Sequence, residues 1–307
     1  MMQDYLVKAM SKNGEIRAFS IDATQTVREA QERFDLWSGS SAALGRTLIA
    51  TALFSKNMKN DERLMIQVQG DGLGGKIFTE GLGNGDVRGY IQHPNIAVDP
   101  NEQGKIDVRK VVGTSGTITV IKDLGMKEPF SGQIPIVDGE LGSDFTYYMA
   151  VSEQINGAIG VSVYVDTDDS IISAGGFMIQ LMPGATEETI TELEERLAKL
   201  PQIYEMMAAG DTPEDMLERI LGEGQVNLLS TEPIRYRCSC NRERFNQGLM
   251  SIGEKDIQEL IDEDNGAEVV CHFCNKKYQY TAEDLEQLIE TIKEKRLLNE
   301  QMDRGEE

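Results

Sequence analysis

The sequence predicts an α+β protein built in three parts. Over residues 1–181, short alternating apolar and polar runs are mixed with helical patterns, which predicts an N-terminal mixed α/β domain with antiparallel-rich sheets. Residues 182–231 keep a helical periodicity and predict a helical connector. Residues 232–307 hold all four cysteines and end in a helical pattern, which predicts a small C-terminal module with a terminal helix. A chain of 307 residues also exceeds what one core usually organises.

Local patterns place the elements of the first part. YLVKAMS and EIRAFSID flank the turn KNG and predict an opening hairpin. Thr24 is positioned to cap a helix whose apolar residues recur from Val27 to Trp37. SAALGRTLIATALFS predicts a second, largely buried helix, and DFTYYMAVSEQ a third. Strands are expected at LMIQVQ, KIFTEG, VRGYI, TITVIKD, GQIPIV and GVSVYV, and the domain is expected to end near GGFMIQLMPG.

The two later parts carry helix signals of their own. TEETITELEERLAKL predicts an amphipathic helix that Pro201 should break, and TPEDMLERIL predicts a shorter one. Further on, PIRYRCSC predicts a short strand that runs into a cysteine pair. Capping boxes are expected from Ser251 to Glu254 and from Thr281 to Asp284, each before a helix.

Composition disfavours several classes of function. The formal net charge is −22, and the chain is acidic both before Glu232 and from that residue on, so we expect no nucleic-acid partner. The N-terminus lacks a basic segment followed by an apolar run, which predicts no signal peptide. The longest apolar stretch is interrupted by Arg46 and is too short for a bilayer. We therefore expect a cytoplasmic protein without a membrane partner.

Two motifs that could indicate catalysis have simpler interpretations. GDGLGG at 70–75 fits a dinucleotide-binding pattern, but KIFTEG after it reads as a strand, whereas the phosphate site needs a helix N-terminus. A hairpin turn is the better interpretation. The chain has only two histidines, and His93 lies in a polar loop. We predict no catalytic residues and no enzyme.

The four cysteines form the strongest motif. Cys238 and Cys240 make a CxC pair, and Cys271 and Cys274 make a CxxC pair after an interval of 30 residues. In a reducing compartment such a cluster more often holds metal than permanent disulfides. Four thiolates close the tetrahedral shell of zinc, so we predict one Zn²⁺ per chain and no position for a reactive water. A thioredoxin-type CxxC is disfavoured because no βαβ pattern surrounds CHFC.

Two features of this site favour a switch over a purely structural zinc ribbon. Cations flank both pairs and should favour the thiolate, which is the form that oxidants attack; they are Arg235, Arg237, Arg242, Arg244, Lys276 and Lys277. A structural zinc contributes about 10–16 kcal/mol to a small domain. Closing a ring of a few residues by a disulfide returns only about 2 kcal/mol. Disulfides between near neighbours therefore could not replace the metal, and oxidation should unfold the module.

At this point the chain resembles the 33-kilodalton heat-shock protein family of redox-regulated holdase chaperones. The cysteine spacing after a helical connector carries the resemblance, together with SAALGRTLIATAL, GDVRGY, VIKDLGMKEPFSGQIPIVDGELGSDFTYYMAVSEQ and GFMIQLMPGA. The resemblance covers nearly the whole chain. It implies a chaperone that holds zinc through four thiolates while it is reduced and inactive.

The resemblance also implies how the protein is activated. Oxidation would form the disulfides Cys238–Cys240 and Cys271–Cys274, release zinc, loosen the module and connector, and expose a surface for unfolding client proteins. Activated members form homodimers and need no ATP. The apolar stripe of the connector is our candidate for the client-binding surface, with the alternative that it packs internally in every state; it consists of Ile190, Leu193, Leu197 and Leu200.

Two other functions remain open from the sequence. One is a constitutive structural zinc-ribbon adaptor that binds a protein or nucleic-acid partner without redox switching. The other is a thiol oxidoreductase that uses CHFC catalytically. Zinc retention under peroxide would favour the adaptor, and multiple-turnover thiol exchange would favour the oxidoreductase.

Overall fold

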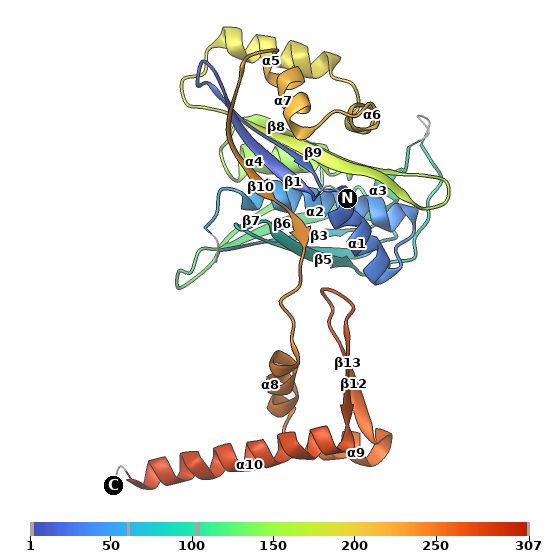
Figure 1. Ribbon diagram of the computed structural model, residues 1–307, viewed down its shortest axis with the longest axis vertical. Coiled ribbons are helices and arrows are strands. Elements are labelled where there is room, and N and C mark those ends of the chain that lie inside the picture. The colour runs from blue at the N-terminus through green and yellow to red at the C-terminus, as the bar shows by residue number, and fades with distance from the viewer. Residues whose placement is uncertain (1–2, 60–61, 102–104, 306–307) are drawn as a thin grey trace. The chain divides into compact units, whose positions relative to one another are not determined.

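The computed structural model describes residues 3–59, 62–101 and 105–305 (Figure 1). The chain forms two compact units, Met1–Arg237 and Cys238–Glu307, and each is described by itself. Residues 182–231, expected as a connector, pack within the first unit. Throughout the described ranges, no helix combines the length and the apolar character needed to cross a membrane.

The first unit contains a five-stranded antiparallel sheet in the order β10-β1-β2-β9-β8. Its strands are β1 Tyr5–Ser11, β2 Ile16–Asp22, β8 Gly157–Val165, β9 Ile171–Leu181 and β10 Val226–Pro233. The predicted opening hairpin is confirmed, since β1 pairs directly with β2. The sheet leaves β10 and β8 as its two edge strands.

A second, six-stranded sheet has the order β11-β5-β4-β3-β6-β7. It comprises β3 Arg63–Gly70, β4 Lys76–Leu82, β5 Asp86–Ile91, β6 Gly116–Asp123, β7 Phe130–Pro135 and the short β11 Arg235–Tyr236. Pairing is antiparallel except between β11 and β5. The GDGLGG motif joins β3 to β4 as a hairpin turn, so the expectation of a turn rather than a nucleotide loop is confirmed.

Helix α2 (Ser38–Ser55) lies between the two sheets and forms the centre of the core. It contacts β8 and β9 of one sheet and β3, β4 and β5 of the other. Every residue of the helix except Arg46 is buried, because both faces are covered. This confirms the predicted largely buried helix. Three more helices complete this layer: α1 Thr24–Phe34, α3 Val108–Val112 and α4 Gly142–Val151.

The start and end of α1 differ from the prediction. Thr24 does not cap the helix but forms its first residue. Two carboxylates accept hydrogen bonds from backbone amides at the N-terminus of α1. Asp22 accepts from the Thr24 N–H at 3.0 Å, and Asp4 accepts from the Thr26 N–H at 2.6 Å. Because Asp4 lies 22 residues before Thr26, the sequence around the helix could not predict this contact. The helix also ends before Trp37, whose side chain is exposed.

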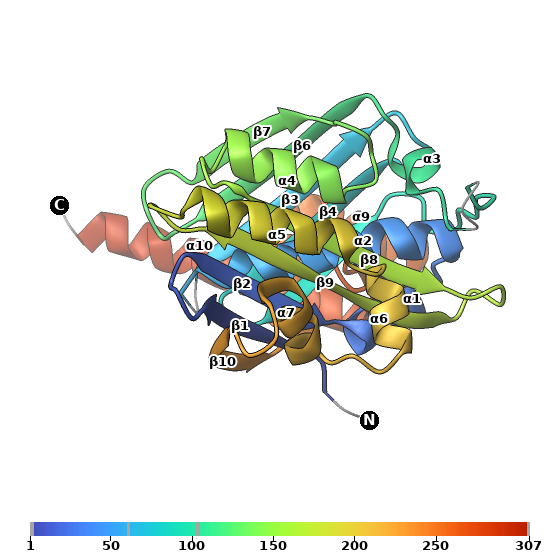
Figure 2. The ribbon, with the colours of Figure 1, turned by 90° about the horizontal axis from the view of Figure 1, so that it is seen from above.

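The connector helices α5 Glu187–Lys199, α6 Ile203–Ala208 and α7 Pro213–Leu221 cover the outer face of the first sheet (Figure 2). Strand residues Val7, Ala18 and Ile179 point to this face and pack against α5 and α7. Pro201 separates α5 from α6, as predicted. The helical connector predicted over 182–231 ends in a strand, because Val226–Pro233 forms β10 and pairs with β1.

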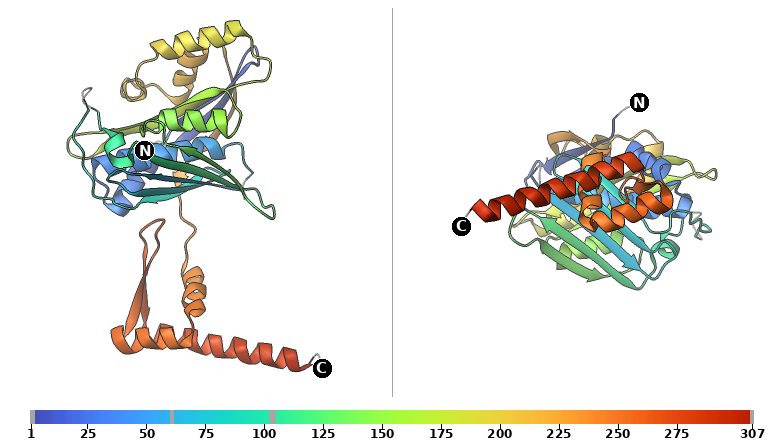
Figure 3. Two further views of the ribbon diagram at one scale, coloured as in Figure 1. Left: turned by 180° about the vertical axis from the view of Figure 1, so that it is seen from behind. Right: turned by 90° about the horizontal axis from the view of Figure 1, so that it is seen from below.

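The second unit is small and consists of α8 Arg242–Ile252, α9 Glu254–Asp264, β12 Gly266–Val270, β13 Lys277–Thr281 and α10 Ala282–Gly305 (Figure 3). Its core is Ile257, Tyr278, Tyr280, Leu285, Leu288 and Ile289. The capping box from Thr281 to Asp284 is confirmed by reciprocal hydrogen bonds of 2.9 and 3.2 Å. The box predicted at Ser251 is wrong, because Ser251 lies inside α8 and Gly253 precedes α9.

Candidate metal centre

Two short segments of the second unit carry the four cysteines. Cys238 and Cys240 lie in the extended chain just before α8, and Cys271 and Cys274 lie in the turn that joins β12 to β13. The turn is closed by backbone hydrogen bonds: the Cys274 and Asn275 N–H groups donate to the Cys271 carbonyl at 3.3 and 2.8 Å. Asn275 takes a left-handed conformation, with φ 56°, which lets the chain reverse within the CxxC segment. The turn therefore points both sulfurs of this segment to one side.

The structure brings all four sulfurs into one group. The Sγ atoms lie within 4.8 Å of one another. The Cys238 Sγ to Cys271 Sγ distance is 3.8 Å, and the Cys240 Sγ to Cys274 Sγ distance is 3.4 Å. These distances exceed a disulfide bond of about 2.05 Å, so the four thiols are free. A tetrahedral zinc with Zn–S bonds of about 2.3 Å would separate its sulfurs by about 3.8 Å.

Burial divides the four thiols into two pairs. Cys271 and Cys274 are buried, whereas Cys238 and Cys240 are half-buried. Burial raises the pKa of the Cys271 and Cys274 thiols above its ordinary value. A group of four thiolates at this spacing would repel one another, and a divalent cation among them would offset that repulsion. The donor set therefore fits a soft metal ion that binds with loss of the thiol protons.

Tyr278 supports the group from β13 and was not indicated by the sequence motifs. Its hydroxyl donates to the Cys240 carbonyl at 3.1 Å and lies 3.4 Å from the Cys240 Sγ. That contact with Cys240 raises the pKa of Tyr278, so the hydroxyl stays a donor. The ring packs on Phe245 of α8, with centroids 4.8 Å apart. The signal in the sequence was the alternation of Tyr278 and Tyr280, which puts both rings on one face of the strand.

Four of the six cations around the cysteines pair with carboxylates. Arg235 and Arg237 pair with Asp86 in the first unit. Arg242 pairs with Asp284 at 2.8 Å, and Lys277 pairs with Glu268 at 3.0 Å. Burial raises the pKa of the Cys271 and Cys274 thiols, and the expectation that the cations favour the thiolates of both pairs stays a prediction. Arg235, Arg237 and Arg242 thus stabilise local structure through these ion pairs.

The remaining candidate residues lie elsewhere. His93 is exposed, and its Nδ1 lies 2.8 Å from the Leu73 carbonyl in the first unit. The candidate client-binding residues belong to α5 and the residue after it. Leu193 is buried in the core beneath the connector, while Leu197 and Leu200 pack against that core. Ile190 is half-buried. In this state of the chain the apolar stripe is therefore largely covered.

Comparison of the sequence with models of known protein families identifies the family of this chain. A model of the Hsp33 protein family matches residues 4–281. The chain belongs to the Hsp33 family. Membership makes it one of a family of chaperones, which act by binding other proteins, and the free-thiol group is compatible with a zinc and disulfide redox centre.

Individual relatives agree with this family. The chain is 53% identical to the 33 kDa chaperonin of Enterococcus faecalis over 94% of this chain and 96% of the relative. It is 50% identical to the 33 kDa chaperonin of Bacillus cytotoxicus over 95% of this chain and all of the relative. The crystal structure of the 33 kDa chaperonin (heat shock protein 33 homolog) from Thermotoga maritima is similar with a TM-score of 0.88 at 33% identity. That likeness covers 94% of this chain and 99% of the crystallised one.

Proposed function

We propose that this chain is a redox-regulated, ATP-independent holdase that binds unfolding proteins under oxidative stress. The observation that carries the proposal is the group of four free thiols within 4.8 Å of one another, in a chain of the Hsp33 family. We place its action in the cytoplasm, where a reducing environment keeps the thiols free until oxidants appear. It uses no catalytic residues.

In the reduced state, Cys238, Cys240, Cys271 and Cys274 would hold one zinc ion. The ion would supply structural cross-linking and no reactive water, because protein sulfurs fill the four positions of a tetrahedral shell. It would tie the turn between β12 and β13 to the segment before α8. The core of this unit is small, so its folding depends strongly on that link.

Oxidation would convert the four thiolates into two disulfides, Cys238–Cys240 and Cys271–Cys274. Each disulfide forms as one S–S bond while two electrons pass to an oxidant such as peroxide. The sulfur distances alone do not select this pairing, because all four atoms lie close together. The pairing comes from the family resemblance, and peptide mapping of the oxidised protein tests it. Once the thiolates are consumed, the unit can no longer retain the ion.

Loss of the ion would unfold the second unit and loosen the connector over residues 182–231. The apolar stripe that is now covered would then reach solvent and bind clients through Ile190, Leu193, Leu197 and Leu200. Exposed apolar surface of this kind also favours self-association, which fits a homodimer as the active form. On this account the reduced protein is inactive because its own sheet occupies the stripe.

The test compares reduced and peroxide-treated protein at mildly elevated temperature. Zinc release is followed with a chromogenic chelator, while light scattering reports the aggregation of a chemically unfolded client such as citrate synthase. We expect zinc release and suppression of aggregation to appear together only after oxidation. Client treated with the same peroxide in the absence of this protein is the control for direct oxidation of the client.

The outcomes separate the candidate functions. Zinc release without any effect on client aggregation would contradict the chaperone proposal. Zinc retention under peroxide would favour the structural zinc-ribbon adaptor. Repeated thiol exchange with a substrate disulfide would favour an oxidoreductase.

A further inference from the structure

The short helix α6 packs on the first sheet through two side chains that lie on glycines. Ile203 and Met207 are four residues apart and therefore share one face of the helix. Ile203 lies on Gly160 of β8, where an added Cβ would stand 3.0 Å from its Cδ1. Met207 lies on Gly175 of β9, where an added Cβ would stand 2.7 Å from its Sδ. The helix approaches the sheet this closely because neither strand position carries a side chain.

The thioether of Met207 lies over the main chain of β9. A Cβ on Gly175 would also stand 3.1 Å from the Met207 Cε, so the sulfur and its methyl group both cover this position. Gly175 pairs with Asp22 of β2 and with Ser162 of β8. Its backbone groups are thus directed sideways within the sheet and are not available to a polar group above it. The contact suits an apolar sulfur and disfavours a polar one.

Exposure distinguishes Met207 from the other methionines of the connector helices. Met206 of α6 and Met216 of α7 are 2% and 0% exposed, whereas Met207 is half-buried. An oxidant in solution must reach a sulfur to oxidise it, so Met207 is the most accessible of the three. Met126, in the turn between β6 and β7, is 62% exposed and lies outside the connector, which makes it a matched control.

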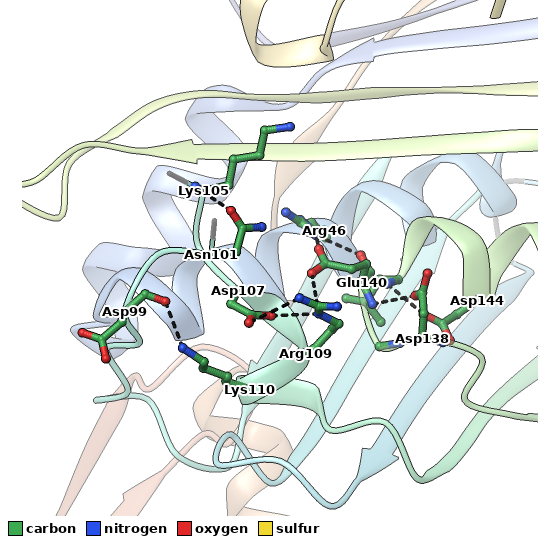
Figure 4. Close-up of polar contacts among 12 residues, drawn as sticks. Arg46, Asp99, Asn101, Lys105, Asp107, Arg109, Lys110, Asp138, Glu140 and Asp144 are labelled. Atoms are coloured by element: carbon green, nitrogen blue, oxygen red, sulfur yellow. Dashed lines mark hydrogen bonds and ion pairs between the residues drawn. The ribbon is translucent and has the colours of Figure 1, made fainter. Parts of the chain in front are cut away.

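The N-terminal end of α6 is fixed by polar contacts. The Lys105 ammonium donates to the side chain of Gln202, the residue before the helix, at 2.8 Å. The backbone N–H of Lys105 donates in turn to the side chain of Asn101 at 3.0 Å (Figure 4). Met207 lies near the opposite end of this six-residue helix, where its packing on β9 holds α6 against the sheet.

The C-terminal end of α6 is joined to α7. The Asp211 N–H donates to the Met206 carbonyl at 3.0 Å, and the Asp211 carboxylate pairs with Arg219 of α7. Helix α7 in turn packs on β1 and β2. A displacement of α6 at Met207 would therefore be passed to the next connector helix.

Oxidation of the thioether is a balanced two-electron step. The Met207 sulfur gives an electron pair to one oxygen of hydrogen peroxide, so an S–O bond forms while the O–O bond breaks. The other oxygen leaves as hydroxide and is protonated to water. The sulfoxide that results is polar, and its oxygen needs hydrogen-bond donors. The main chain of β9 offers none above its plane, so α6 must move outward for water to reach the new oxygen.

We propose that Met207 is a site of reversible oxidation to methionine sulfoxide, and that this modification loosens α6 from β8 and β9 whatever the state of the four cysteines. Methionine sulfoxide reductases would restore the thioether. The site lies outside the cysteine group, and its oxidation does not depend on the proposed function. In the proposed holdase it would give the connector a second response to oxidants.

The test separates the methionine from the cysteines by selective reduction. The zinc-loaded full chain is treated with peroxide and then with dithiothreitol and zinc, which restores the thiols but leaves methionine sulfoxide. Peptide mass spectrometry locates the added oxygen. We expect amide exchange within 203–208 to be at least about fivefold faster after this cycle, and to return to its starting rate after treatment with methionine sulfoxide reductases A and B. Met207→Leu keeps an apolar side chain without a sulfur, and should exchange alike before and after the cycle.

A second arm needs no oxidant. Met207→Gln places a polar side chain of similar length over Gly175 in the reduced, zinc-loaded protein. We expect amide exchange within 203–208 to be at least about fivefold faster than in the parent, with zinc retained. Met126→Gln introduces the same polarity at the exposed turn, and should leave this exchange unchanged.

Three results would overturn the proposal. They are equal exchange in the parent before and after the cycle, an equal acceleration in Met207→Leu, and equal exchange in Met207→Gln and Met126→Gln. Because these measurements use protein with restored thiols and zinc and contain no client, their failure is distinct from failure of the chaperone assay.

Discussion

Each sulfur of the cysteine group should matter for zinc, including the two that are buried. Cys271→Ser replaces a thiolate with a hydroxyl that stays protonated and binds zinc poorly. Loss of an outer-shell partner costs about 10–100-fold in metal affinity, so loss of a ligand is expected to exceed about 100-fold. Chelator competition under reducing conditions measures the change. An unaltered affinity would show that Cys271 is not a ligand.

Tyr278 should tune the same site without binding the metal. Tyr278→Phe keeps the ring on Phe245 but removes the hydroxyl beside the Cys240 sulfur. We expect zinc affinity to fall about tenfold, in the range for outer-shell partners. Tyr280→Phe is the matched control, since that hydroxyl bonds Asn246 and makes no contact with sulfur. Equal effects of the two variants would assign Tyr278 a general packing role.

At the residue scale, sequence reasoning succeeded where spacing alone determines the chemistry. Four soft ligands in two short motifs predicted the sulfur group, because a CxC and a CxxC turn can each direct two sulfurs to one side. The partners of the arginines were not predicted, because a charge in the sequence does not reveal its partner. Asp86, which pairs with Arg235, is remote in the chain and joins it only through the pairing of β11 with β5.

Among the helices, α10 begins at the clearest local sequence signal, which is the capping box from Thr281 to Asp284. Thr281→Ala removes the hydroxyl that accepts from the Asp284 N–H. Loss of such a cap should destabilise the second unit by about 1 kcal/mol. Zinc release on heating, followed with a metal-sensitive dye, should move to lower temperature. Thr291→Ala, which removes a hydroxyl bonded within the helix, should leave that temperature unchanged or raise it.

The connector helix α5 is held by a single fully covered leucine. Leu193→Ala should destabilise its packing on the sheet by about 2–5 kcal/mol, because the side chain is buried among Ala9, Leu217 and neighbouring residues. Amide exchange within 187–199 should become faster in the reduced protein. Glu194→Ala, on the exposed face, is the control and should leave exchange unchanged. If exchange is the same in both variants, the stripe does not hold α5 in place.

Most elements were predictable because their patterns are local. The buried helix α2, the break at Pro201 and the strands of the two sheets other than β9 and β10 follow from periodicity and backbone chemistry. Strand β10 was missed, because VNLLSTEP follows a helical segment and gains its structure from the edge of β1, which is more than 200 residues away. Likewise, the position of β8 at the edge of its sheet cannot be predicted from GVSVYV alone.

For the whole molecule, strand pairing sets how far unfolding of the second unit can spread. The chain between the connector helices and Cys238 forms two strands. Of these, β10 pairs with β1, and β11 pairs with β5. Tyr236 is buried there, and its hydroxyl donates to the Gly89 carbonyl at 2.8 Å. Loosening of the connector therefore requires more than unfolding of the cysteine unit. It requires the loss of β10 from its sheet edge.

The hydrogen bond from Tyr236 to Gly89 anchors this segment to the second sheet, and it leads to a prediction. Tyr236→Phe removes the hydrogen bond to Gly89 but keeps the ring, and should lower the peroxide concentration needed for chaperone activity about twofold. Zinc affinity should not change, since Tyr236 belongs to the first unit. Dose–response curves of client aggregation measure the effect. A variant with the parent's dose–response would show that this anchor does not restrain activation.

The central claim is that oxidation of four cysteines unfolds one unit and releases the connector together with β10, while the other strands of the two sheets persist. Hydrogen–deuterium exchange of the full chain before and after peroxide, resolved by peptide, tests it most directly. We predict loss of protection across 238–281, across α5, α6 and α7, and in β10, with β1 to β9 retained. Protection that survives in 238–281 after zinc has been released, or that disappears from both sheets together, would contradict the account.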